Sequence, residues 1–330
     1  MNGLLKKLTL AVSAAAFAAS LGMAGTAKAG SIPESDEPIK LAMNEWTGQH
    51  ISTHVAGEVL KKMGYNVEYV TAGYYPQMAA LRDGTVTATM ELWSSNIGDH
   101  YTDALASGKV IEIGDLGLDA IETWFVPDFV LEMCPGLPDY MALYDCAELF
   151  ATPDTFPNGR FVDYPPDWGD SNSKRIEALD LPFTSIPSGS EGALIAEIKA
   201  AYASKTPLIL QFWEPQWAQA AYPMTRVLLP VYEDACYDDP SWGVNPDMTY
   251  DCNWKPGRVF KMAWIGMQDK WPGALALLSN LQLSNADQNA MMQAIDVDGR
   301  DLDEVVHEWL DNNEYTWQVW VGAAAVAASE

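Results

Sequence analysis

The stretch that decides the fold is PLILQFWEPQW, residues 207–217. Its apolar run ends at Trp213 and is bounded by Pro207 and Pro215, which is typical of a strand buried on both faces of a parallel α/β sheet. In open sheets of this class, ligands bind beyond the carboxyl ends of the strands. We therefore expect Trp213 to present its indole at the edge where a ligand would bind.

Two other strand-like stretches end in the same way, residues 39–46 at Trp46 and residues 85–93 at Trp93. Each tryptophan taken alone could be an ordinary core aromatic residue. Three strand-end tryptophans, each followed by small or polar residues, instead indicate indole faces gathered around one opening. The sequence thus predicts an aromatic site at the strand ends.

The segments around these strands alternate between helix and strand patterns. Residues 49–62 have apolar residues at helical spacing, residues 66–70 alternate like a strand, and residues 75–83 look like a short helix. The order strand, helix, strand, helix, strand predicts a parallel sheet with right-handed crossovers. Residues 124–131 form a further extended run interrupted by a proline, which we interpret as a crossing between two domains.

The first 29 residues are predicted to be a cleaved secretory signal and not part of the fold. Two lysines precede the apolar run 8–23, and Ala27-Lys28-Ala29 supplies the small-x-small pattern of a cleavage site. A membrane anchor would need about 20 apolar residues with polar flanks on both sides. We expect a mature chain that begins near Gly30 and works in the periplasm.

The chain is strongly acidic. It has 19 lysine and arginine residues and 45 aspartate and glutamate residues, which gives a formal net charge of −26 at pH 7. Removal of the signal leaves 16 basic residues and a net charge of −29. Such a charge excludes nucleic acid and anionic membrane surfaces as partners and favours cations. The length is also sufficient for two core-forming domains.

Four cysteines fit an oxidising compartment, and they allow three pairings in principle. Pairing in sequence order joins Cys134 to Cys146 and Cys236 to Cys252 and closes two short loops. Each such bridge contributes roughly 3 kcal/mol through the entropy of the unfolded chain. We predict this pairing, because neither pair has the CxxC spacing or the nearby histidine of a metal site.

Two residues at the crossing are candidates for the site, with an alternative for each. Trp124 could face the space between the domains or pack between them. Glu132 is the first acidic residue after the extended run. Its carboxylate could lie beside a bound cation or be an ordinary solvated side chain.

A fourth tryptophan, Trp168, stands directly before Gly169, Asp170 and a predicted helix that begins at residue 173. A helix N-terminus presents unpaired N–H groups and the positive end of the helix dipole, which suit an anionic oxygen. Trp168, Gly169 and Asp170 are therefore candidate binding residues.

An acidic loop, residues 231–254, surrounds the second cysteine pair. Clustered carboxylates on such a loop could hold a hard cation such as Ca²⁺, with Asp234, Asp238, Asp239 and Asp247 as weak candidates. The loop lacks the EF-hand spacing, so a solvated acidic loop is the alternative. We expect no other cofactor to be required.

Several indole faces around one space suit a quaternary or methylated ammonium. Such a cation is weakly hydrated, and each ring face contributes roughly 0.5 to 2 kcal/mol by cation–π attraction. The four histidines belong to no nucleophile or metal motif, and HExxH, GxSxG, Walker A and GxGxxG patterns are absent from the sequence. The sequence predicts a binding protein and not an enzyme.

Five short stretches carry a family resemblance: NEWTGQ at 44–49, ELWSS at 91–95, DWG at 167–169, FWEPQW at 212–217 and LQLSNADQN at 281–289. Through them the chain resembles the substrate-binding proteins of ABC importers for glycine betaine and related compounds (ProX/OpuAC-like). The stretch EMCPG at 132–136 is similar to the branch that includes trimethylamine N-oxide-binding proteins.

The resemblance implies a two-lobed clamshell (type II), each lobe a sheet flanked by helices, that traps its ligand in the cleft. One lobe would comprise residues 31–127 plus 231–330 and the other residues 128–230, with hinges near Pro127 and Pro230. We expect a monomer that delivers its ligand to an ABC permease and its ATPase. A chemoreceptor-coupled binding protein without transport is the alternative.

The resemblance also implies an aromatic cage. Carried over by position, the cage tryptophans of the family fall on Trp93, Trp168 and Trp213. The strand-end pattern and the domain crossing add Trp46 and Trp124. A methylated amine held by these indoles is the expected ligand.

The sequence departs from the family pattern in the segment that binds a ligand carboxylate. In betaine binders, the backbone after the second cage tryptophan holds the ligand carboxylate, which corresponds here to Gly169 and Asp170. Asp167 and Asp170 flank that tryptophan, and Arg160 is the one basic residue we consider as a partner. This departure favours trimethylamine N-oxide, then glycine betaine or choline, and assigns Glu132 to the methylated nitrogen.

A second hypothesis from a different class is a secreted carbohydrate-active enzyme or sugar-binding protein. Tryptophans also stack on sugars, and glycosidases use paired carboxylates. Glu45, Glu91 and Glu214 would be its candidate acids, since each lies beside a strand-end tryptophan. Turnover of a glycoside would establish it.

Overall fold

The first three strands form the predicted parallel unit. The computed structural model describes residues 31–329, so the predicted signal sequence lies outside the described residues. β2 and β3 both pair in parallel with β1, and helices connect the strands, which confirms the predicted crossovers. The elements are β1 (Ile39–Met43), α1 (Thr47–Lys62), β2 (Val67–Thr71), α2 (Pro76–Asp83) and β3 (Ala88–Trp93).

Local sequence signals account for these elements. α1 buries Ile51, Val55 and Val59, which recur every four residues and so lie on one face of the helix. α2 begins at Pro76, where a proline sacrifices no helical hydrogen bond, and ends at Gly84 in the left-handed conformation. β3 is buried along its whole length, as expected for a central strand.

One long strand, β4, connects the two halves of the sheet. It pairs antiparallel with β10 in the first half and with β8 in the second half. The complete order is β2-β1-β3-β10-β4-β8-β6-β7, and β9 also pairs with β4. The bounds are α3 (Asp99–Ala106), β4 (Val110–Pro127), β8 (Leu210–Glu214), β9 (Met224–Arg226) and β10 (Gly257–Trp264).

The strand predicted from the deciding stretch is β8, in the second half of the sheet. It is parallel to β6 and antiparallel to β4, so the α/β sheet is mixed and not purely parallel as predicted. An apolar run records burial on both faces, which is the same for either direction of the neighbouring strand. The neighbouring elements are β6 (Gly159–Asp163), α6 (Ser171–Ala178), β7 (Phe183–Pro187) and α7 (Glu191–Ser204).

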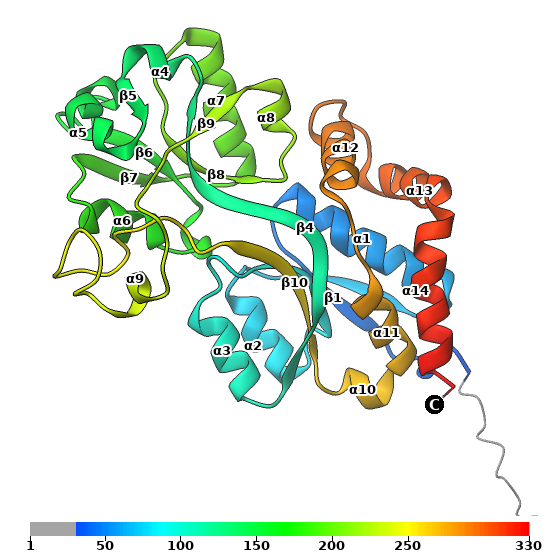
Figure 1. Cartoon of the computed structure of the whole chain (residues 1–330). Helices are drawn as coiled ribbons and strands as arrows, with labels where there is room; N and C mark the ends of the chain where they lie inside the picture. The colour runs from blue at the N-terminus through cyan, green and yellow to red at the C-terminus, as the bar shows by residue number, and fades with distance from the viewer. Residues whose placement is uncertain (1–30, 330) are drawn as a thin grey trace, which may run out of the picture.

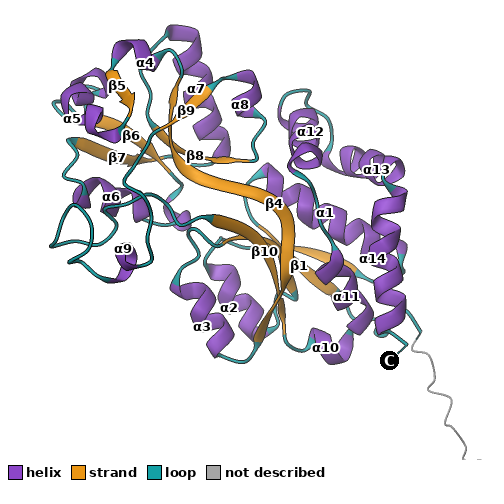
Figure 2. Ribbon diagram, viewed as in Figure 1, coloured by secondary structure: helices purple, strands orange, loops and turns teal. Residues whose placement is uncertain are grey.

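Short elements and a C-terminal helical layer complete the fold (Figures 1 and 2). The sheet halves form two lobes, with β1 to β3 and α10 to α14 in one and β6 to β9 in the other (Figure 1). No helix within residues 31–329 is long and apolar enough to cross a membrane. The remaining elements are α4 (Val130–Met133), β5 (Pro135–Pro138), η1 (Tyr140–Ala142), α5 (Leu143–Cys146), η2 (Ala147–Phe150), η3 (Pro166–Trp168), α8 (Ala218–Ala221), α9 (Ala235–Asp238), α10 (Met267–Lys270), α11 (Pro272–Asn280), α12 (Asn285–Asp296), α13 (Leu302–Asn312) and α14 (Glu314–Ala327).

β4 runs from one half of the sheet into the other and ends at Pro127, the position of the first predicted hinge. It exchanges β10 for β8 between Ala120 and Ile121. A proline interrupts a strand pattern, but the pairing partners decide to which lobe a strand belongs. We define the first lobe as residues 31–120 and 257–329 and the second lobe as residues 121–256.

We assign the acidic loop to the second lobe because it packs against α6. Arg175 of α6 is fully buried, and its Nε donates to the Cys252 carbonyl oxygen at 2.6 Å. The Arg175 guanidinium also lies 4.5 Å from the ring centre of Trp254. These contacts fix the loop on α6, and they join residues too far apart in the chain for a local pattern to reveal them.

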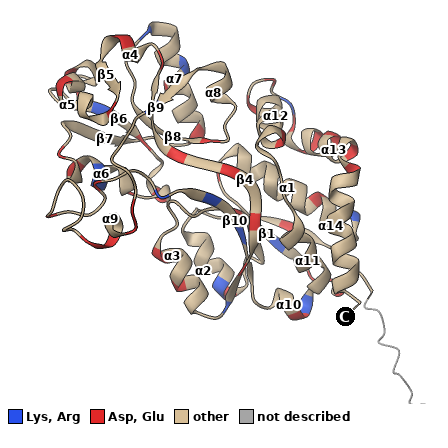
Figure 3. Ribbon diagram, in the orientation of Figure 1, with Lys and Arg blue, Asp and Glu red and all other residues tan. Residues whose placement is uncertain are grey.

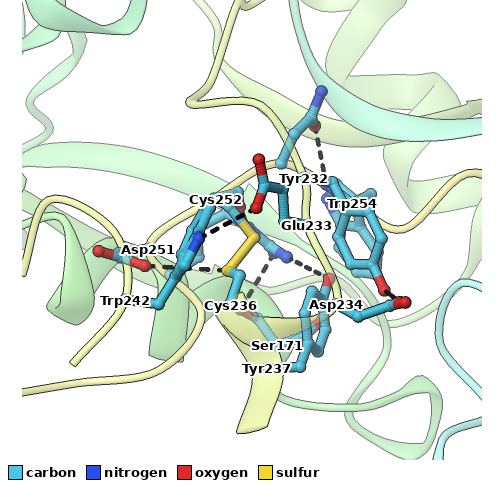
Figure 4. Close-up of a disulfide and its surroundings, with 12 residues drawn as sticks. Ser171, Tyr232, Glu233, Asp234, Cys236, Tyr237, Trp242, Asp251, Cys252 and Trp254 are labelled. Carbon is cyan, nitrogen blue, oxygen red and sulfur yellow. Dashed lines mark hydrogen bonds between the residues drawn. A yellow bond between two sulfur atoms is a disulfide. The ribbon is translucent and has the colours of Figure 1, made fainter. Parts of the chain in front are cut away.

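Both predicted disulfides are present, and both brace the second lobe. Cys134 and Cys146 have Cα atoms 5.8 Å apart, and Cys236 and Cys252 have Cα atoms 6.3 Å apart. Figure 4 shows the second bridge within the acidic loop, with Asp251 beside it. No cysteine is free in the part of the chain that the structure describes.

Lys261 of β10 is a fully buried lysine that holds α11 on the sheet. Its Nζ donates to the backbone oxygens of Leu278, Ser279 and Leu281 at 2.7, 3.1 and 2.5 Å. The last carbonyl groups of a helix have no partner within the helix. Lys261 therefore supplies the donor that the C-terminal end of α11 lacks.

We expect Lys261→Met to lower the free energy of unfolding by about 2 kcal/mol, because buried carbonyl groups lose their donor. Urea unfolding followed by circular dichroism measures this change. Lys255→Met, at an exposed position, is the control and should change stability by less than about 0.5 kcal/mol. Equal stability of the two variants would contradict the role assigned to Lys261.

Candidate functional site

A small cavity lies between the two lobes at the ends of β1, β3 and β8. The volume between its lining atoms is about 300 Å³. The structure brings Trp46, Trp93 and Trp213, the three strand-end tryptophans, together here with Trp168 of η3. The complete lining is Trp46, Tyr74, Trp93 and Asn96 from the first lobe and Glu122, Tyr164, Trp168 and Trp213 from the second.

The aromatic rings meet at steep angles and are not stacked. The ring centre of Trp168 lies 5.3 Å from Trp46 and 5.5 Å from Trp213, with interplanar angles of 72° and 70°. Tyr74 meets Trp46 at 64° and 5.7 Å. Edge-to-face contacts are favourable for aromatic pairs. They gather the rings into one aromatic wall of the cavity.

Glu91 of β3 lies behind two of these rings and fixes their orientation. Its Oε1 accepts from Trp46 Nε1 at 2.7 Å and from Trp93 Nε1 at 3.2 Å. Its Oε2 accepts from Ser52 Oγ and Gln288 Nε2, each at 3.0 Å. Four donors thus satisfy a carboxylate that is 1% exposed. The sequence had suggested Glu91 as a catalytic acid, whereas the structure shows it holding tryptophans.

Glu122 of β4 is the one carboxylate among the cavity-lining residues. It faces Trp213 across the β4–β8 ladder and accepts from Asn96 Nδ2 at 3.2 Å. Ser95 Oγ and the Tyr164 hydroxyl donate to it in short hydrogen bonds. Burial raises the pKa of Glu122 to about 7, against the opposing effect of these donors.

Sequence reasoning missed Glu122, Tyr164, Tyr74 and Asn96. A signal for Glu122 was present, because it is an acid inside the extended run of β4. The other three lack one, since their place at the cavity depends on contacts with residues distant in the chain. Tyr74, for example, is held by its hydroxyl, which accepts from the Trp93 backbone N at 2.9 Å and donates to Asn96 Oδ1 at 2.7 Å.

Two predicted site residues lie elsewhere. Trp124 packs 4.8 Å from Phe161 in the core of the second lobe, and its Nε1 donates to Asn172 Oδ1 at 2.7 Å. It follows Glu122 along β4 and lies in the interior of the second lobe, not beside the cavity. Glu132 is exposed on α4, because the chain has already left the sheet at that point. Neither side chain lines the cavity.

Gly169 and Asp170 lie at the rim. The Tyr75 hydroxyl of the first lobe donates to the Trp168 carbonyl oxygen at 2.8 Å, and a Cβ on Gly169 would lie 2.6 Å from that hydroxyl oxygen. Gly169 therefore permits a contact between the lobes. Asp170 is exposed, and its Oδ1 binds Lys174 Nζ at 2.8 Å, so its side chain points away from the cavity.

The predicted calcium candidates do not converge. Asp234 accepts from the Tyr232 hydroxyl at 2.5 Å, and Asp239 accepts from Ser241 N at 2.9 Å. Within residues 31–329, no group of three or more histidine, cysteine or acidic side chains is arranged to hold a metal ion. The structure gives the calcium interpretation of Asp234, Asp238, Asp239 and Asp247 no support.

Comparisons with known proteins point to one family. Residues 37–312 match the family OpuAC, described as the substrate binding domain of an ABC-type glycine betaine transport system. The trimethylamine N-oxide-binding protein of Pelagibacter ubique (strain HTCC1062) is 30% identical over 291 residues, 86% of this chain and 90% of that protein.

Solved structures share the fold. A choline-binding protein of an ABC transporter, in complex with choline, has a TM-score of 0.70 and 19% identity, over 90% of this chain and 98% of that chain. Lactococcal OpuAC, closed on glycine betaine, has a TM-score of 0.66 and 16% identity, over 87% of this chain and 100% of that chain.

We expect Glu91→Ala to disorder the cavity wall, because Trp46 and Trp93 lose their common acceptor. The near-ultraviolet circular dichroism of the tryptophans should weaken while the far-ultraviolet spectrum is retained. The free energy of unfolding should fall by on the order of 3 kcal/mol, since buried donors are left unpaired. Glu148→Ala, at an exposed position of the second lobe, is the control. An unchanged near-ultraviolet spectrum in Glu91→Ala would disprove this role.

Proposed function

The chain belongs to the OpuAC family, the substrate-binding domains of ABC-type glycine betaine transport systems, and we propose that its own ligand is trimethylamine N-oxide, with choline as the second candidate. Members of this family bind substrates for transport, so the chain is a substrate-binding protein and not an enzyme. The carbohydrate-active alternative has no support. Two of its candidate acids are already engaged, Glu91 by four donors and Glu214 by Arg226 Nη2 at 2.6 Å.

The observation that carries this proposal is the composition of the cavity. Four indoles, two phenols, one amide and one carboxylate line it, with no basic side chain among them. Each indole face that meets a trimethylated nitrogen is worth roughly 0.5 to 2 kcal/mol. Such a nitrogen carries no N–H group, so an aromatic cage leaves no donor unsatisfied. These properties suit a methylated amine.

Glu122 argues against a ligand with its own carboxylate. A ligand carboxylate buried beside the ionised form of Glu122 would meet like charge, and no basic side chain lines the cavity to compensate. Arg160, the basic partner considered from the sequence, donates through Nη1 to Glu197 at 3.0 Å and does not line the cavity. Trimethylamine N-oxide presents one small acceptor oxygen instead, and choline presents one hydroxyl.

Glu122 can serve either ligand, in different protonation states. Its pKa, raised to about 7 by burial, makes both states accessible near neutral pH. The protonated carboxyl donates a hydrogen bond, which suits the oxygen of the N-oxide. The ionised carboxylate accepts a hydrogen bond from the choline hydroxyl and attracts its positive charge. Protonation of Glu122 would then select between the two ligands.

We also propose that the protein acts as a monomer in the periplasm and passes its ligand to an ABC permease driven by an ATPase. The predicted signal sequence and the two disulfides support export to an oxidising compartment. Acidic side chains on both lobes favour cationic ligands (Figure 3). Coupling to a chemoreceptor is the alternative, and adjacent permease and ATPase genes would favour transport.

Isothermal titration calorimetry of the mature chain against trimethylamine N-oxide, choline, glycine betaine and carnitine tests the ligand assignment. We expect strong heats from the first two and weak heats from the two carboxylates. Preference for glycine betaine would overturn the argument from Glu122. Absence of a binding heat from all four compounds would overturn the methylated-amine assignment.

We expect Trp93→Ala, Trp168→Ala and Trp213→Ala each to weaken binding of trimethylamine N-oxide by at least about tenfold, because each removes one cation–π face. Calorimetry measures the dissociation constants. Trp317→Ala is the control, since Trp317 lies on α14, away from the cavity. Affinity close to wild type in all three cage variants would contradict the aromatic cage.

We expect the preference between the two ligands to depend on pH through Glu122. As the pH rises from about 6 to about 8, Glu122 loses its proton, so the affinity for trimethylamine N-oxide should fall relative to that for choline. Glu122→Gln resembles the protonated form. The variant should retain its affinity for trimethylamine N-oxide and bind choline more weakly. The ratio of the two affinities should then no longer depend on pH. A ratio that is independent of pH in the wild type would refute this role.

A further inference from the structure

A second buried carboxylate joins the lobes outside the cavity. Glu191, the first residue of α7 in the second lobe, is 4% exposed. Its Oε2 accepts from the backbone N of Thr47, the first residue of α1 in the first lobe, at 2.8 Å. Its Oε1 accepts from Gln216 Nε2 at 2.7 Å. One side chain therefore connects a helix of each lobe.

Asp296, the last residue of α12, makes the reciprocal connection from the first lobe. Its Oδ1 accepts from Thr47 Oγ1 at 2.8 Å, and its Oδ2 accepts from Trp217 Nε1 of the second lobe at 2.8 Å. Thr47 thus donates to both carboxylates, through its backbone N to Glu191 and through its hydroxyl to Asp296.

The partners of these two carboxylates come soon after cage tryptophans in the sequence. Thr47 is next to Trp46, and Gln216 and Trp217 come shortly after Trp213. A shift of either cage tryptophan therefore shifts a partner of Glu191 or Asp296. Closure around a ligand and formation of these contacts become one movement.

We propose that Glu191 and Asp296 form a closure latch: they are positioning residues that hold the lobes together around the bound ligand and set its rate of release. The latch rests on the proposed function, since it needs a ligand that closes the lobes. None of its residues lines the cavity, so it acts on the ligand through Trp46 and Trp213.

Closure of the lobes should also lead Glu191 to bind a proton. Burial, and then the negative charge of Asp296, raise the pKa of Glu191 to about 8. The N-terminal ends of α1 and α7 oppose this shift. Lys199, also on α7, has its Nζ 5.3 Å from the ring centre of Trp217, whose Nε1 donates to Asp296. The His50 ring of α1 bonds to the Asn44 carbonyl oxygen.

The sign of the effect follows from the open form. When the lobes part, Glu191 meets water and its pKa returns toward that of a free glutamate, about 4.3. Between these two values the closed form binds more protons than the open form, so ligand affinity should fall as the pH rises toward 8. The effect acts on closure, and it therefore applies equally to trimethylamine N-oxide and to choline.

Stopped-flow tryptophan fluorescence with trimethylamine N-oxide and choline tests the latch. We expect Glu191→Ala to release each ligand at least about tenfold faster than the wild type, with little change in the association rate. Glu197→Gln is the matched control on the same helix, because Glu197 pairs with Arg160 inside the second lobe. Its release rates should equal those of the wild type.

Calorimetry in phosphate and in Tris, whose ionisation enthalpies differ, counts the protons bound with the ligand. We expect uptake by the wild type at about pH 7, and uptake reduced in Glu191→Gln, whose amide is neutral in both forms. The melting temperature of each variant without ligand shows that it is folded. A purely structural role would leave the proton count unchanged.

The outcomes for the latch and for the function are separate. Absence of wild-type binding would overturn the proposed function. Wild-type binding with wild-type release from Glu191→Ala would overturn the latch alone. An equal proton count in the wild type and in Glu191→Gln would overturn the proton-linked part of it.

Discussion

The cavity depends on a buried carboxylate that a ligand would never touch. Glu91 accepts hydrogen bonds from the indoles of Trp46 and Trp93, so two walls of the cage share one anchor. Gln288 of α12 and Ser52 of α1 complete its coordination. An ionised group is costly to bury unless every oxygen has donors. The arrangement therefore tolerates few alternatives, which keeps the ring faces fixed before a ligand arrives.

Carboxylates recur around the cleft with different tasks: Glu91, Glu122 and Glu191 are buried, and Asp296 is partly exposed. Glu91 orients rings, Glu122 faces the guest, and Glu191 and Asp296 bridge the lobes. No basic side chain lines the cavity to neutralise them. A ligand that carries positive charge and no carboxylate balances the negative charge of these side chains. An anionic ligand adds to that negative charge.

The sequence predicted the parts of this molecule that local patterns encode. The β-α-β-α-β unit follows from periodicity, and Trp46, Trp93 and Trp213 follow from their place at strand ends. Glu122 is visible in the sequence as an acid inside an extended run, but its place at the cavity depends on Ser95, Asn96 and Tyr164, which contact it from other segments. Trp124 packs in the core of the second lobe, because β4 continues past the cavity into that core. Hydrogen-bonding partners assign each strand to a lobe, and the prolines that suggested the hinges do not encode those partners.

The insertion of one lobe within the other has a consequence for how the chain folds. The second lobe is one unbroken stretch, residues 121–256, whereas in the first lobe β10 lies between β3 and β4. That central strand is synthesised after the whole second lobe. Until it arrives, β3 and β4 each lack a neighbour, and the contacts that close the first lobe span long loops with a high entropic cost. The second lobe can therefore complete its core first, and the lobe that contains the N-terminus is the last to be finished.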